Sequence, residues 1–82
     1  MKTRKTDDRI DLLYQLGRRI AYLRKERKMS QLDLAIESTL ATSYVSELEK
    51  GKRNPSIETL SKVAKALQVT LSELLRGVSS ID

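Results

Sequence analysis

The stretch that decides the fold covers residues 30–51 and reads SQLDLAIESTLATSYVSELEKG. Ser30, with Asp33 three residues later, approximates a capping box, which predicts that a helix begins here. Its apolar pattern lasts barely two turns before a polar run interrupts it, and a second helical pattern follows. That second pattern stops at Gly51, a residue that terminates helices at little conformational cost. The stretch therefore predicts two short helices joined by a tight link, at about residues 31–37 and 42–50.

Helical patterns also flank this stretch on both sides. Ahead of it, apolar residues recur at spacings of three and four, as on one face of a helix: Ile10, Leu13, Leu16, Ile20 and Leu23. Behind it, Ser56 can cap a fourth helix whose apolar face starts at Ile57, and Thr70 with Glu73 forms a capping box for a fifth. We expect an all-α, compact five-helix domain over residues 7–77, with helices at about 7–28, 31–37, 42–50, 56–67 and 71–76. Residues 1–6 are expected to be a flexible basic arm and 78–82 a C-terminal tail.

The composition bounds what such a chain does. Its 82 residues include no Cys and no His, which removes disulfides and the commonest metal ligand and general base. A glycine-rich phosphate loop is also absent, so we expect no enzyme, no metal and no cofactor. With a single domain expected, we also expect no small-molecule ligand. Apolar runs are only a few residues long, so no membrane span or secretory signal is expected, and the predicted location is cytoplasmic.

Charge is distributed unevenly along the chain. The net charge is +5, which favours polyanionic partners without choosing among them. Residues 1–29 carry ten Lys and Arg against four Asp and Glu, whereas residues 30–50 carry Lys50 alone against four acidic residues. If the two short helices bind a polyanion, the contacts to its charged backbone must therefore come largely from their flanks.

Two short helices that meet at a steep angle present the end of the second helix to the major groove of DNA. The sequence at this point resembles the Xre/Cro/cI-type helix-turn-helix family of phage repressors, plasmid regulators and restriction–modification controller proteins. The resemblance covers residues 17–77. It is carried by four separate motifs: Ser30-Gln31-x-x-Leu34-Ala35, Tyr44-Val45-Ser46-x-x-Glu49-x-Gly51, Asn54-Pro55-Ser56 and Ala66-Leu67-x-Val69.

The resemblance implies that the helix after Leu40 is the recognition helix. Residues on its leading edge would then contact base edges: Thr42, Ser43, Tyr44, Ser46 and Glu47. Phosphate contacts would come from the start of the preceding helix and from the following loop: Gln31, Lys50, Lys52, Arg53 and Asn54. The family also often pairs an arginine late in the first helix with the glutamate before the glycine, which implies a structural ion pair between Arg24 and Glu49.

Some of these roles stay open at the level of sequence. Tyr44 either contacts the sugar–phosphate backbone or packs its ring against the preceding helix. Glu47 either accepts a hydrogen bond from a cytosine amino group or repels the nearby phosphates. Gln31 either holds a phosphate or supports the recognition residues.

Two positions depart from the family pattern. Where the family usually has glycine in the turn, this chain has Thr39, and a β-branched residue is strained at positive φ, which favours a different turn. Where the family favours a capping side chain, this chain has Ala41. Either Thr42 replaces the cap, which would occupy its hydroxyl, or the recognition helix begins without one.

The C-terminal part carries more apolar residues than one short helix buries alone, and we expect them to form a homodimer interface: Leu71, Leu74, Leu75, Val78 and Ile81. The predicted function is sequence-specific binding of double-stranded DNA by a homodimeric transcriptional regulator on a near-palindromic operator. The alternative is an antitoxin-type protein-interaction module that also binds its own promoter.

Overall fold

The computed structural model describes residues 8–79, and in that range it contains five helices and no strand. This confirms the all-α fold. The helices are α1 (Asp8–Glu26), α2 (Gln31–Ser38), α3 (Thr42–Glu49), α4 (Ile57–Ala66) and α5 (Leu71–Leu74). The expected basic arm, residues 1–6, and Ile81 in the expected tail lie outside the described residues.

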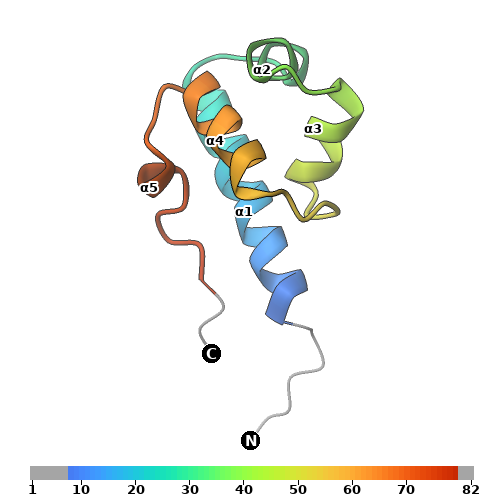
Figure 1. Cartoon of the computed structure of the whole chain (residues 1–82), viewed down its shortest axis with the longest axis vertical. Coiled ribbons are helices and arrows are strands. Elements are labelled where there is room, and N and C mark those ends of the chain that lie inside the picture. The colour runs from blue at the N-terminus through green and yellow to red at the C-terminus, as the bar shows by residue number, and fades with distance from the viewer. Residues whose placement is uncertain (1–7, 80–82) are drawn as a thin grey trace, which may run out of the picture.

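The long helix α1 is the centre of the arrangement. Figure 1 shows α3 on one side of α1 and α5 on the other, with α4 crossing between them and α2 at one end. Buried side chains from all five helices, and from the residue that ends α4, form one core: Leu16, Ile20, Leu23, Leu34, Val45, Leu48, Val63, Leu67 and Leu74. Ile57 is not among them. It is 61% exposed because it is the first residue of α4, directly after the Ser56 cap, so placing it on the apolar face was wrong.

The first helix ends two residues earlier than its pattern suggested. Lys28 has a φ of 57°, in the left-handed region, and the amide of Met29 donates to the carbonyl of Arg24 at 3.1 Å. Such a left-handed residue after the last turn is a common helix ending. The chain therefore leaves α1 at Glu26 and turns into α2 within four residues.

The fifth helix is also shorter than its capping motif suggested. It covers Leu71–Leu74 instead of 71–76. The Thr70 hydroxyl accepts from the amide of Glu73 at 3.0 Å as expected. The Glu73 carboxylate, however, is bound by Arg19 and Arg76. Within residues 8–79, only one half of the expected capping box therefore forms.

The link between α2 and α3 keeps the left-handed turn despite its threonine. Thr39 has φ 58° and ψ 40°, and the amide of Leu40 donates to the carbonyl of Ala35 at 2.9 Å. The expectation of a different turn was wrong. The surrounding bonds hold the strained residue in place: the Thr39 hydroxyl donates to the Ser38 carbonyl, and the buried Ser38 hydroxyl donates to the carbonyl of Leu34 at 2.6 Å.

Candidate nucleic-acid interface

The leading edge of α3 lies at the surface. Its N-cap is Ala41, which supplies no side-chain hydrogen bond, so Thr42 is the first helical residue and not the cap. Of the two alternatives for the start of the recognition helix, the structure therefore shows the one in which the helix begins without a capping side chain. Thr42 and Ser43 are both exposed, and the first amides of α3 have no capping side chain. Free amides at a helix N-terminus favour anions, because the helix dipole is positive there.

A network of polar side chains fixes α3 to the two preceding helices. Arg24 on α1 donates to both carboxylate oxygens of Glu49, from Nε to Oε2 at 2.6 Å and from Nη2 to Oε1 at 3.0 Å. Its remaining nitrogen, Nη1, donates to the carbonyl of Met29 at 2.8 Å. Gln31, at the start of α2, donates to Oε1 of Glu49 at 3.0 Å. The structure thus brings Arg24, Glu49 and Gln31 together and favours the supporting role for Gln31.

Two glycines let the end of α3 approach α1 closely. A Cβ added at Gly17 would lie 2.4 Å from the carbonyl oxygen of Glu49, closer than packing allows. Gly51, with a φ of 78°, ends α3, and a Cβ there would lie 2.9 Å from the Cα of Tyr14. The termination at Gly51 agrees with the sequence, whereas the contact at Gly17 was not foreseen. Its signal was a glycine inside an otherwise regular helical pattern.

On the outer face of α3, the Arg53 side chain contacts two candidate base-contacting residues, Glu47 and Tyr44. Its Nε donates to Oε1 of Glu47 at 2.8 Å, and its guanidinium carbon lies 5.4 Å from the centre of the Tyr44 ring. Glu47 is therefore already paired, and Arg53 folds back along the helix. Tyr44 is half-buried and packs against the core, so the structure favours packing for its ring and leaves its face to the arginine.

The remaining candidate phosphate ligands surround the end of α3. Lys50, Lys52 and Asn54 are all exposed. Lys50 is the C-cap of α3, and the amide of Lys52 donates to the carbonyl of Glu47 at 2.9 Å. Ser46 is half-buried in the middle of the helix. The cationic loop thus begins at the C-terminal end of α3, and the polar leading edge lies at the other end.

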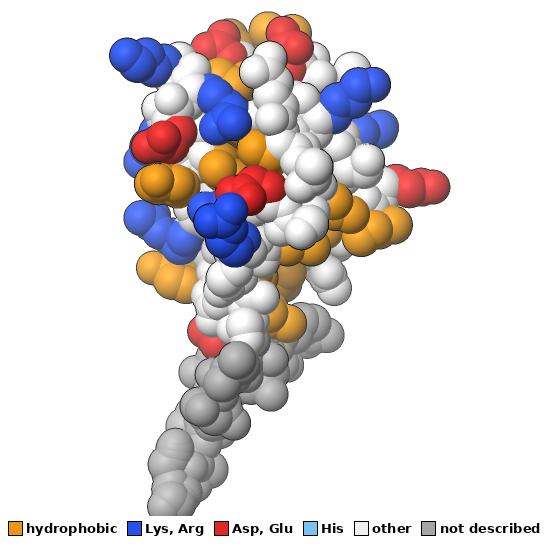
Figure 2. Space-filling model, turned by 90° about the vertical axis from the view of Figure 1, so that its left-hand side faces the viewer, with side chains coloured by type: hydrophobic (Ala, Val, Ile, Leu, Met, Phe, Trp, Pro, Cys, Tyr) orange, Lys and Arg blue, Asp and Glu red, His pale blue; other side chains and the backbone are white. Residues whose placement is uncertain are grey.

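The expected dimer residues divide into two groups. Leu74 is completely buried in the core of the single chain, so its side chain is not available to a partner, and its assignment to the interface was wrong. Leu71, Leu75 and Val78 are only half-buried. Arg19 secures this region by donating to the carbonyl and the carboxylate of Glu73 at 2.8 and 2.9 Å. Figure 2, which views the side on which α5 lies, shows apolar side chains in separate groups among Lys and Arg.

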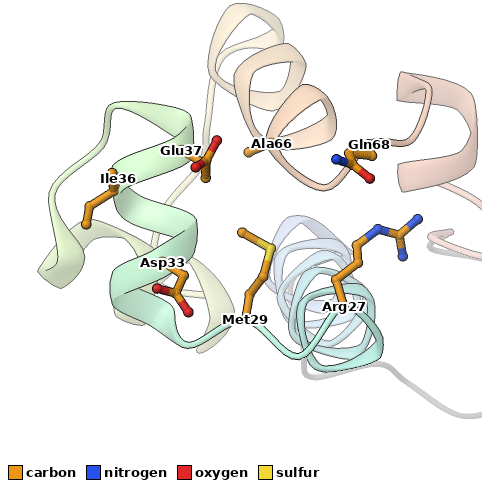
Figure 3. A pocket seen from close by; sticks show the side chains of 7 residues that line it. All are labelled: Arg27, Met29, Asp33, Ile36, Glu37, Ala66 and Gln68. Carbon is orange, nitrogen blue, oxygen red and sulfur yellow. The ribbon is translucent and has the colours of Figure 1, made fainter.

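A shallow hollow of about 430 Å³ lies where the end of α1 meets α2 and α4. Met29 points into it toward Ala66, and Asp33, Glu37 and Arg27 surround it (Figure 3).

Residues 8–79 contain no cluster of acidic side chains able to hold a metal ion. None of the helices described has the length and apolarity needed to cross a membrane.

This geometry, a rigidly held short helix with an exposed polar leading edge at one end and a cationic loop at the other, is that of a helix-turn-helix protein. The model of the helix-turn-helix family HTH_3 matches residues 20–74, and the chain belongs to this family. This confirms the resemblance.

Relatives and solved structures agree with this assignment. The immunity repressor protein of Bacillus phage phi105 is 42% identical over 60 residues, covering 73% of this chain and 42% of the repressor. The control protein C.MunI from a Mycoplasma species is 38% identical over 69 residues, covering 83% of this chain and 93% of that protein. The crystal structure of the restriction–modification controller protein C.AhdI from Aeromonas hydrophila superposes with a TM-score of 0.74 at 40% identity. It covers 76% of this chain and 94% of C.AhdI. The chain spans about half or less of the length of the first two curated relatives it matches.

Proposed function

We propose that this chain is a sequence-specific double-stranded DNA-binding transcriptional regulator that acts as a homodimer on a near-palindromic operator. The observation that supports this most is the start of α3. Thr42 and Ser43 are exposed on an uncapped helix end, and the Arg24–Glu49–Gln31 network holds that helix against its neighbours. A preorganised helix end of this kind fits the major groove without rearrangement.

Affinity and specificity come from different residues in this proposal. Lys50 and Lys52 supply phosphate contacts, and the affinity therefore falls steeply with salt concentration. Thr42, Ser43 and Ser46 contact base edges, where hydroxyl groups pair with any base and specify weakly by themselves. Leu71, Leu75 and Val78 form the contact between two copies, which places two recognition helices on successive turns of one face of the duplex.

The test is a titration of Ser43→Ala and Lys52→Ala against a selected operator and an unrelated duplex. Ser43→Ala lowers the affinity for the operator and leaves the affinity for the unrelated duplex nearly unchanged. Lys52→Ala lowers both by a similar factor. Equal losses on both duplexes for Ser43→Ala would contradict the placement of the leading edge of α3 in the groove.

A further inference from the structure

The geometry points to Arg53 as the residue that reads a guanine, with Glu47 and Tyr44 as positioning residues that hold its guanidinium beside α3. This inference rests on the proposed DNA-binding function and replaces two sequence-based roles. Glu47 was expected to contact a base directly, and Arg53 was expected to bind a phosphate.

The guanidinium of Arg53 lies beside α3, away from the loop that carries it. Arg53 belongs to the loop after α3, yet its Nε is 2.8 Å from the carboxylate of Glu47 in the middle of that helix. Its guanidinium carbon also lies 5.4 Å from the centre of the ring of Tyr44, one turn closer to the leading edge. The loop residue therefore carries its positive charge back along the helix. The sequence of α3, TSYVSELE, has no Lys or Arg of its own.

Arg53 keeps most of its hydrogen-bond donors for a ligand. A guanidinium has five N–H donors, and the Glu47 bond uses the one on Nε. Neither terminal nitrogen of Arg53 donates a hydrogen bond to another residue in the range 8–79. The Arg53 side chain is 52% exposed. These terminal nitrogens form the pair of parallel donors that matches O6 and N7 of guanine in the major groove.

The ion pair between Arg53 and Glu47 restricts the arginine side chain more than it stabilises the fold. An exposed pair of this kind contributes little to folding stability, and the Glu47 side chain is 44% exposed. Its effect is to restrict a long, flexible side chain to one position, which lowers the entropy lost when that side chain contacts a base. It also neutralises a carboxylate that would otherwise face the phosphates.

The chemistry of α3 leaves room for such a reader. Thr42, Ser43 and Ser46 discriminate weakly between bases, because a hydroxyl both donates and accepts. Arginine with guanine is the commonest specific contact in protein–DNA complexes. Arg53 would therefore supply most of the preference at one base pair of each half-site.

The experiment compares the wild type with Arg53→Ala, Glu47→Ala and the double variant. Each is titrated against the selected operator and against duplexes with every single base change in one half-site. Lys52→Ala is the control for a phosphate contact. Arg53→Ala reduces the guanine preference at one position by about tenfold to a hundredfold. Glu47→Ala relaxes the same position, and the double variant loses no more preference than Arg53→Ala alone.

Glu47→Ala gives one more readout that a purely structural role would not move. Because it removes a negative charge, it strengthens binding to unrelated duplexes while it weakens discrimination on the operator. The two single variants and the double variant keep the wild-type melting temperature to within a few degrees, since the side chains of Arg53 and Glu47 are both half-exposed.

Two outcomes would overturn the inference while the wild type still selects a consensus. In one, Arg53→Ala weakens binding equally on all sequences and lowers the slope of affinity against salt by about one, as for a phosphate ligand. In the other, Glu47→Ala relaxes a different base pair and its effect adds to that of Arg53→Ala. A wild type that selects no consensus would instead contradict the proposed function itself, and this inference with it.

Discussion

Arg24 and Glu49, 25 positions apart in the sequence, form a two-bond ion pair between α1 and the end of α3, at 2.6 and 3.0 Å. Their side chains are only 11% and 7% exposed. Arg24 binds both carboxylate oxygens of Glu49, and Gln31 also donates to Oε1. The pair therefore sets the angle at which α3 leaves the core, and with it the direction of the leading edge.

Removing one partner of this pair is expected to be costly. Glu49→Ala leaves the largely buried Arg24 guanidinium without its counter-charge, and the expected loss is about 3 kcal/mol of unfolding free energy. Chemical denaturation followed by circular dichroism measures it. Glu26→Ala, at the exposed end of α1, is the matched control and is expected to cost less than about 0.5 kcal/mol. A similar small cost at Glu49 would mean that the pair does not hold α3.

Thr39→Gly is expected to stabilise the fold. Threonine at a φ of 58° is strained, whereas glycine adopts this conformation freely, at the cost of a more flexible unfolded chain. The expected net gain is about 1 kcal/mol. Thr39→Ala is the control, because alanine is also strained in the left-handed region and should give no such gain. Equal effects of the two substitutions in thermal melts would show that backbone strain is not the cause.

Acidification is expected to weaken the start of α2 through Asp33. Its carboxylate accepts the Ser30 amide at 2.8 Å, and this bond, together with the Ser30 side chain, holds the pKa of Asp33 below its usual value of 3.8. A lowered pKa in the folded state means that the stabilisation is present above the unfolded value and is lost as pH falls through the folded value.

The matching measurement is the melting temperature of Asp33→Asn against the wild type between pH 7 and pH 2. The wild type should melt higher at pH 7, and the difference should shrink below pH 3.8. Glu37→Gln, which removes a carboxylate from the exposed side of the same helix, is the control for loss of charge. A difference for Asp33→Asn that stays constant with pH would exclude the ionised cap as its source.

Val78→Lys is expected to weaken the proposed homodimer. Val78 is half-buried, as are Leu71 and Leu75, and its amide donates to the carbonyl of Leu75. A charge at this position would be desolvated in the proposed contact between copies. We expect the dimer dissociation constant to rise at least about tenfold in sedimentation equilibrium. Ile57→Lys, at a side chain that is 61% exposed on α4, serves as the control. If both variants dimerise like the wild type, the interface lies elsewhere.

Local signals in the sequence were enough to place most of the fold. The capping box at Ser30 and Asp33, the Ser56 cap and the terminating Gly51 all lie where the pattern put them. Each depends on residues within four positions of one another, so neighbouring residues determine it. Apolar spacing likewise identified Leu16, Ile20 and Leu23 as core residues.

The features that were missed depend on residues distant in the chain. Gly17 is required by the carbonyls of Leu48 and Glu49, more than thirty positions away. Leu74 is buried because it packs into the core with residues of the earlier helices, and the adjacent Glu73 is bound by Arg19 of α1. The turn at Thr39 was misjudged because propensity alone opposes it, whereas the bonds around it hold the conformation.

The same distinction applies to the candidate site. Its positions along α3 follow from the family motif, but the contact between Arg53 and Glu47 depends on how the loop folds back. A loop arginine six positions downstream has many reachable partners, and nothing in the spacing selects one.

The most direct test of the central claim is selection of bound sites from a pool of random duplexes by the wild-type chain. The account predicts a near-palindromic consensus, with half-sites whose centres lie about 10 base pairs, or about 34 Å, apart on one face of the duplex. Recovery of sequences with no common pattern, at any salt concentration that permits binding, would contradict it.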